Sequence, residues 1–198
     1  MFMKNRGFRA GKLLVLIFLC FSVLLPLFTL FFHIDGEDIS KVIHLSLIHI
    51  YSPGNHELLS KNRKAYETLL KQSGIHILKD ETAFVDHRFY VIGRKDKKER
   101  RMELATFIKS CQADKPIIVI DHRPCFDDVH AIDLQVSGHT HQGQIFPNTL
   151  FTKLAYPYDY GTYQKPYPMI VSSGAGTWGL PIRIGTTSEI VKITLKGQ

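Results

Sequence analysis

The sequence has few cysteines, and they show no pattern that would organise a fold. Cys20, Cys111 and Cys125 are spread along 198 residues, without a Cys-x-x-Cys pair. Their spacing gives no support to a thiolate zinc site or to a framework of several disulfides. A Cys111–Cys125 bridge stays open if the domain is exported.

The chain also lacks the positive charge of a typical nucleic-acid-binding protein. Its formal net charge is +7, but Lys4, Arg6, Arg9 and Lys12 carry four of those charges with no acid among them. The rest of the chain therefore carries only +3, so no nucleic-acid partner is expected. The hydrophobic content of 44% is enough for one domain with a packed core.

One long apolar run stands near the N-terminus. Residues 13–32 contain no charged side chain, and a helix of that length crosses the hydrocarbon core of a bilayer. A cleaved signal peptide is the alternative, but the run is long for one and no small-x-small cleavage site follows it. We therefore expect a basic cytoplasmic tail at 1–12, an uncleaved single-pass anchor at 13–32, and a cell-membrane protein whose domain lies outside the cytoplasm.

An irregular junction is expected at 33–51 and one domain at 52–198. Apolar spacing predicts a helix over 57–73, closed by Gly74, and a second helix up to about Cys111. Continuous apolar runs at 116–120 and 131–136 are typical of strands covered on both faces. A long loop rich in aromatic residues is predicted after Gln144; such loops are commonly functional, although packing against the domain is the simpler role for most of these rings. Shorter strands are predicted at 75–78, 83–85, 89–92, 169–173, 182–184 and 189–195.

Polar side chains follow three apolar segments, namely the β-prone run at 41–50 within the junction and the runs at 116–120 and 131–136. Asn55 and His56 lie in a turn signal, His122 follows the run at 116–120, and His139 and His141 follow the run at 131–136. Open α/β sheets place ligand-binding groups at such strand ends. On an extended backbone His139 and His141 would face one side and could bind one ion or two adjacent ions.

An isolated His-x-His is more often a solvated or hydrogen-bonded pair, so the metal hypothesis depends on the combination of these segments. Nitrogen and amide-oxygen donors that arrive from separate strand ends favour zinc, manganese or iron.

Three motifs in order resemble those of the calcineurin-like metallophosphoesterases. They are Gly-Asn-His-Glu at 54–57, Asp-His-Arg-Pro at 121–124 and Gly-His-Thr-His at 138–141. The segment at 172–179, with Arg183 and Glu189 after it, looks like the membrane-associated bacterial branch. The resemblance covers about residues 52 to 196. It implies an α/β fold, a partial metallophosphoesterase sandwich of mixed β-sheets flanked by helices, after one N-terminal transmembrane helix.

The resemblance also implies an activity, the hydrolysis of phosphate mono- or diesters by metal-activated water. Asn55, His122 and His139 would bind one ion, and His141 the other. His56 matches the non-ligand histidine that stabilises charge or protonates the leaving oxygen; a hydrogen bond at a helix start is its alternative role. Lipid-linked, nucleotide and simple phosphodiesters would all suit such a site.

Two motifs of the family do not occur before Gly54. Asp-x-His and Gly-Asp-x-x-Asp would supply the remaining ligands and the carboxylate that bridges two ions, and Asp35 and Asp38 lack their spacing. A deletion or a sequence junction is one interpretation, and Gln142 replaces the family's usual glycine. We therefore expect one ion rather than two. The alternative function is a catalytically impaired or inactive, truncated member of the family that keeps the domain as a binding or structural module in the membrane.

Overall fold

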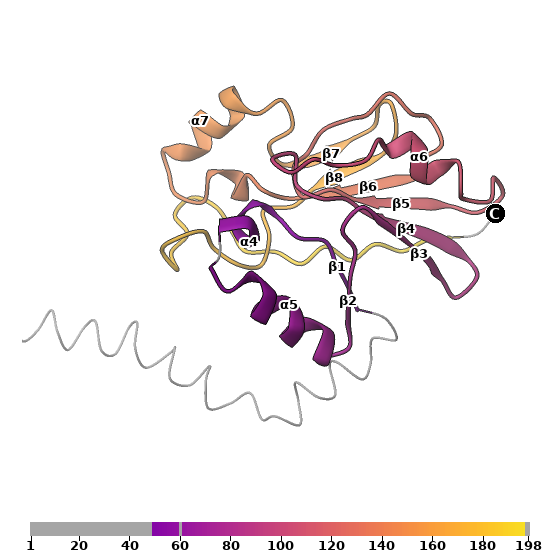
Figure 1. Ribbon diagram of the computed structural model, residues 1–198. Helices are drawn as coiled ribbons and strands as arrows, with labels where there is room; N and C mark the ends of the chain where they lie inside the picture. The colour runs from indigo at the N-terminus through magenta and orange to yellow at the C-terminus, as the bar shows by residue number, and fades with distance from the viewer. Residues whose placement is uncertain (1–48, 60, 197–198) are drawn as a thin grey trace, which may run out of the picture. The chain divides into compact units, whose positions relative to one another are not determined.

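The described residues fold around two β-sheets, one of two strands and one of six (Figure 1). The computed structural model describes residues 49–59 and 61–196. The predicted tail, the predicted anchor and residues 33–48 of the junction lie outside this part. Within the described part, no helix is long and apolar enough to cross a membrane.

The small sheet is a strand–helix–strand unit. Its strands β1 (His49–Tyr51) and β2 (Ile75–Ile77) run parallel. The crossover between them contains α4 (Asn55–Leu59) and α5 (Arg63–Gln72). A connection through helices is what parallel pairing of nearby strands requires.

Residues 49–51, at the end of the predicted junction and next to its β-prone run, form β1. One prediction is corrected here. The single helix predicted over 57–73 is two helices, because Lys61 and Asn62 form a turn between them. Asparagine favours turns and helix starts over helix interiors, since its side chain competes for backbone hydrogen bonds.

The large sheet has the strand order β3-β4-β5-β6-β8-β7. Its four inner strands are parallel, and each edge strand is antiparallel to its neighbour. Its strands are β3 (Glu81–Val85), β4 (Phe89–Gly93), β5 (Ile117–Ile120), β6 (Leu134–Ser137), β7 (Gly161–Tyr163) and β8 (Met169–Val171). Mixed strands with flanking helices confirm the α/β class.

Three short helices complete the regular structure of the described residues. They are α6 (Leu104–Ile108), the 3₁₀ turn η2 (His141–Gly143) and α7 (Asn148–Ala155). The segment after Gln144 is therefore not a plain loop, since it contains α7 and β7.

The strands predicted at the end of the chain are only partly confirmed. The segment at 169–173 supplies β8, and that at 182–184 supplies one bridge, from Ile184 to Ile145. The segment at 189–195 has the alternating pattern of a strand but pairs with neither sheet, and Ile190 is 90% exposed. An alternating pattern forms a strand only where a partner edge is available.

Alternate residues of β4 fill cores on the two faces of the large sheet. Tyr90 and Ile92 pack with Leu104 of α6, whereas Val91 packs with Leu78. Ile50 of β1 packs against the second of these clusters. The inner strands are thus covered on both faces, which explains their continuous apolar sequence.

Candidate metal centre

The polar residues that follow β1, β5 and β6 meet at one edge of the structure. His122 lies two residues beyond β5, and His139 two residues beyond β6; because these strands are parallel neighbours, their carboxyl ends share an edge. Asn55 arrives from the small sheet as the first residue of α4. Ser52 holds that connection in place, donating a hydrogen bond at 2.8 Å to the carbonyl oxygen of Arg94 after β4.

Gly54 and Glu57 shape the start of α4. The Glu57 carboxylate accepts a hydrogen bond from the Gly54 backbone N–H at 2.9 Å, which satisfies a donor at the helix start as a capping box does. Gly54 is buried against the His122 imidazole, and a Cβ added to it would lie 2.7 Å from Nδ1 of that ring. Because Gly54 has no side chain, the backbone at this motif lies close to the His122 imidazole, and the next residue, Asn55, contacts that ring.

Three atoms converge there, and we call them the donor triangle: Oδ1 of Asn55, Nε2 of His122 and Nδ1 of His139. Oδ1 lies 2.8 Å from Nε2 and 3.0 Å from Nδ1, and the two nitrogens are 3.2 Å apart. Neutral imidazole has one N–H, and the amide oxygen has none. At most two of the three contacts can therefore be hydrogen bonds, and the third brings two lone pairs or two N–H groups together.

The spacing of the donor triangle fits a divalent ion. Metal–nitrogen bonds of about 2.1 Å place two ligands at right angles roughly 3.0 Å apart. All three contacts are within 0.2 Å of that separation, and imidazole with amide oxygen suits zinc, manganese or iron. These three atoms therefore have the spacing and the chemistry that a transition-metal site would need.

Electrostatics keep both imidazoles in the form that binds metal. Burial, with Arg123 and His122 next in size, lowers the pKa of His139 to about 4. Burial also lowers the pKa of His122. Nη1 of Arg123 lies 3.2 Å from Nε2 of His139. Nε of Arg123 donates a hydrogen bond at 2.7 Å to the buried carboxylate of Asp96. Both rings are therefore neutral near pH 7, as ligation requires.

His141 lies outside the donor triangle. The backbone turns at Thr140 (φ −77°, ψ −20°) and enters η2, so the condition under which His139 and His141 would face one side, an extended backbone, is not met. Nδ1 of His141 is buried, and within the described residues it has no hydrogen-bond partner. Burial, followed by Arg183, lowers its pKa. A buried nitrogen without a partner is what a second ligand site would leave.

The backbone around these histidines is strained. His139, His141 and Gln142 all have positive φ, at 74°, 51° and 53°. Such values are uncommon for residues other than glycine and cluster at functional sites. Glycine would adopt the φ angle of Gln142 without strain. This explains why the family usually has glycine at this position, where this chain has glutamine.

His56 is exposed on α4, and its ring centroid lies 6.2 Å from that of Trp178. In the described part of the chain its side chain makes no hydrogen bond, so the alternative of a helix-start hydrogen bond has no support. The imidazole faces the cavity beside the donor triangle.

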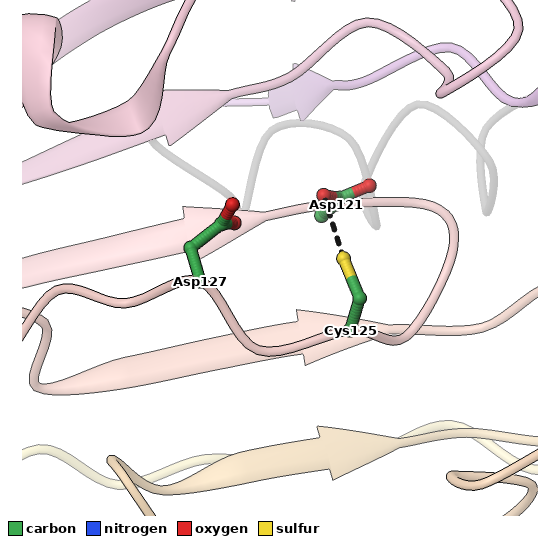
Figure 2. A group of neighbouring side chains, drawn as sticks. All are labelled: Asp121, Cys125 and Asp127. Carbon is green, nitrogen blue, oxygen red and sulfur yellow. Dashed lines mark hydrogen bonds between the residues drawn. The ribbon is translucent and has the colours of Figure 1, made fainter.

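A second group, Asp121, Cys125 and Asp127, also has the composition of a metal site. Figure 2 shows the Cys125 thiol facing the Asp121 carboxylate. Two guanidinium groups already neutralise it: Arg94 pairs with both carboxylates, and Arg101 donates to Asp121 at 2.8 Å. This cluster is a buried ion-pair network that anchors the residue before His122. Cys111 and Cys125 are both free thiols, so no bridge joins them.

Residues that support the site were not predicted from sequence. The buried Gln144 side chain donates to the carbonyl of Trp178 at 2.9 Å and accepts from its N–H. Arg183 donates to the carbonyls of His141 at 3.2 Å and Ser173 at 2.7 Å. No local spacing signals these contacts, since they join segments 10 to 42 residues apart.

Proteins of similar sequence carry the metallophosphoesterase name. A Helicobacter pylori protein named "uncharacterized metallophosphoesterase" is 34% identical over 158 residues, 73% of this chain and 42% of the relative. A similarly named Campylobacter jejuni protein is 32% identical over 157 residues, 75% of this chain and 42% of the relative. A Danio rerio "transmembrane protein with metallophosphoesterase domain" is 30% identical over 166 residues, 74% of this chain and 38% of the relative.

The chain therefore belongs to the metallophosphoesterases, as its motifs predicted. It spans less than half the length of these three relatives. No family model matches the sequence. No solved structure matches it.

Proposed function

We propose that the chain is a membrane-anchored, metal-dependent phosphoesterase, and that Asn55, His122 and His139 bind its divalent ion. The observation that carries this proposal is the donor triangle, whose three edges of 2.8–3.2 Å cannot all be hydrogen bonds. The family name of the relatives supports the same reaction class.

The residues around the donor triangle would have different roles in the proposed reaction. A bound divalent ion supplies positive charge to a phosphate ester and lowers the pKa of water. His56, which is exposed and whose side chain makes no hydrogen bond in the described part, would protonate the leaving oxygen. Arg123 lies beside His139 and keeps positive charge next to the position of the phosphate. Gln144 and Arg183 hold the loops around the site.

We infer one ion per chain. The donor triangle would supply three ligands, whereas for the second ion the described residues offer one family-matched ligand, His141, whose Nδ1 has no hydrogen-bond partner among them. Without the family's bridging carboxylate, two dications a few ångströms apart would repel each other. Manganese, zinc and iron all suit the donors.

Calorimetric titration with Mn²⁺ tests the ligands. We expect about one ion per chain in the parent, and a loss of at least 10-fold in affinity for His122→Ala, since a catalytic ion has only about three protein ligands. His130→Ala is the matched control, because His130 is exposed and lies on the same connection between β5 and β6. Equal affinity in all three proteins would disprove the ligand assignment.

Turnover of bis-p-nitrophenyl phosphate tests the activity separately. A rate that rises with Mn²⁺ occupancy and disappears in His122→Ala supports an active enzyme. A metal-loaded protein without turnover would favour the alternative, an inactive member that serves as a binding module.

Membrane anchoring and substrate are part of the same proposal. The uncharged segment at 13–32 and the basic residues before it support a single-pass protein with an extracytoplasmic domain. In such a location a lipid-linked phosphate ester is a candidate substrate.

A further inference from the structure

An apolar cavity of about 650 Å³ opens beside the donor triangle. Asn55 and His139 contribute to its lining on the metal side, and Phe151, Tyr156 and Trp178 line it elsewhere. In Figure 1, α7 and the yellow C-terminal loop stand at the same end of the large sheet as α4. The volume is that of an ordinary small-molecule site.

The aromatic side of the cavity is fixed by polar contacts behind it. Gln144 is 5% exposed, and its amide binds both the N–H and the carbonyl of Trp178. α7 lies directly against η2, where a Cβ on Gly143 would meet the Thr149 nitrogen at 2.5 Å. The backbone of the aromatic side is therefore held before any ligand arrives.

The rings on this side remain largely uncovered. Phe151 is 63% exposed and Trp178 is 61% exposed. Large apolar rings left beside a polar site are the usual form of a ligand pocket, in which a few polar groups fix the orientation. Since the backbone behind the rings is held, an apolar ligand group gains their burial without first ordering the loop.

We propose that this cavity binds the apolar alcohol group of the phosphate ester, so that the preferred substrates carry an aliphatic or aromatic group. The inference rests on the proposed function, which places the phosphate at the donor triangle. The His56 ring, 6.2 Å from the Trp178 ring, stands where the two parts meet. The ester oxygen then faces His56 while the carbon chain lies against Trp178.

The experiment compares ethyl phosphate with hexyl phosphate, both below micellar concentrations and with saturating Mn²⁺. Trp178 is the single tryptophan of the chain, so its fluorescence reports the cavity directly, and calorimetry gives an independent Kd. Full burial of a methylene group tightens binding about fourfold. Because the cavity is partly open, we expect hexyl phosphate to bind at least ~10-fold more tightly.

Two variants of α7 test the position. Phe151→Ser removes a ring of the cavity and should reduce the preference for the longer chain to about threefold or less. Leu154→Ser is the matched control, because Leu154 is 86% exposed on the same helix and does not line the cavity. Its preference should equal that of the parent.

The outcomes separate this inference from the function on which it rests. Mn²⁺ binding with equal affinity for the two esters overturns the inference and leaves the metal site standing. A chain-length preference without Mn²⁺ binding overturns the metal site and supports an apolar pocket. Equal losses in Phe151→Ser and Leu154→Ser, with binding of the parent to plain phosphatidylcholine vesicles, would show that α7 contacts a membrane surface instead.

Discussion

Replacing Gly54 by Ala should weaken metal binding although no ligand is changed. A Cβ on Gly54 would lie 2.7 Å from both Cε1 and Nδ1 of His122, and 2.9 Å from Cδ2. The φ angle of Gly54 lies outside the left-handed region, so alanine meets no backbone strain there. The imidazole is therefore the group that must move.

The displacement can be estimated from the contact distances. Ordinary van der Waals contact begins at 3.4 Å, so the ring must retreat by roughly 0.7 Å. Metal sites accept errors in ligand distance of only about 0.2 Å. Loss of the groups that orient a ligand typically lowers metal affinity about 10- to 100-fold, which corresponds to about 1.4–2.7 kcal/mol.

Calorimetric titration with Mn²⁺ measures this loss, with Gly138→Ala as the control. Gly138 also adjoins a candidate ligand, His139, but its added Cβ would approach only the Ser172 carbonyl oxygen, at 3.8 Å. Its Kd should stay within about twofold of the parent value. If Gly54→Ala folds and also keeps the parent Kd, the claim that Gly54 positions His122 is refuted.

Other contacts predict outcomes that separate catalysis, stability and topology. His56→Ala should leave the Kd of Mn²⁺ unchanged and lower phosphodiester turnover by about 10²- to 10⁴-fold, because the imidazole moves a proton without holding the ion; an unchanged rate would exclude His56 from the reaction. Asp121→Asn should lower the free energy of unfolding in urea by about 3 kcal/mol, since the guanidinium groups of Arg94 and Arg101 would lose a buried carboxylate; a change under about 0.5 kcal/mol would contradict that reasoning. If residues 13–32 span the membrane as proposed, protease added to intact cells should degrade the domain, and protection until lysis would reverse the topology.

The meeting of His122 and His139 could be predicted because it depends on strand geometry alone. Each follows a continuous apolar run, such runs become inner strands of a parallel sheet, and the carboxyl ends of neighbouring strands share an edge. Asn55 belongs to a different sheet, so strand geometry did not connect it to the histidines. The link between Asn55 and the two histidines could be predicted only from the order of the family motifs.

The local backbone between His139 and Gln142 could not be predicted in this way. The alternation of side chains applies to a strand, but β6 ends at Ser137. The turn that follows is held by the hydroxyl of Thr140, which donates to the carbonyl of Asp159 at 2.6 Å. That partner is 19 residues away, so the local sequence contains no sign of it.

Among the described residues, the three candidate ligands Asn55, His122 and His139 are all neutral donors. The carboxylates that act electrostatically on His122 are those of Asp96 and Glu57, and both are engaged, by Arg123 and by the Gly54 N–H. Neither carboxylate is one of the three donor atoms, so a dication held by the donor triangle would keep a net positive charge. If the substrate is a phosphate ester, as proposed, it would supply the negative charge that a bridging carboxylate would otherwise bring. Metal and ester should then strengthen each other's binding by the same factor, because the ester would complete the electrostatics of the proposed site.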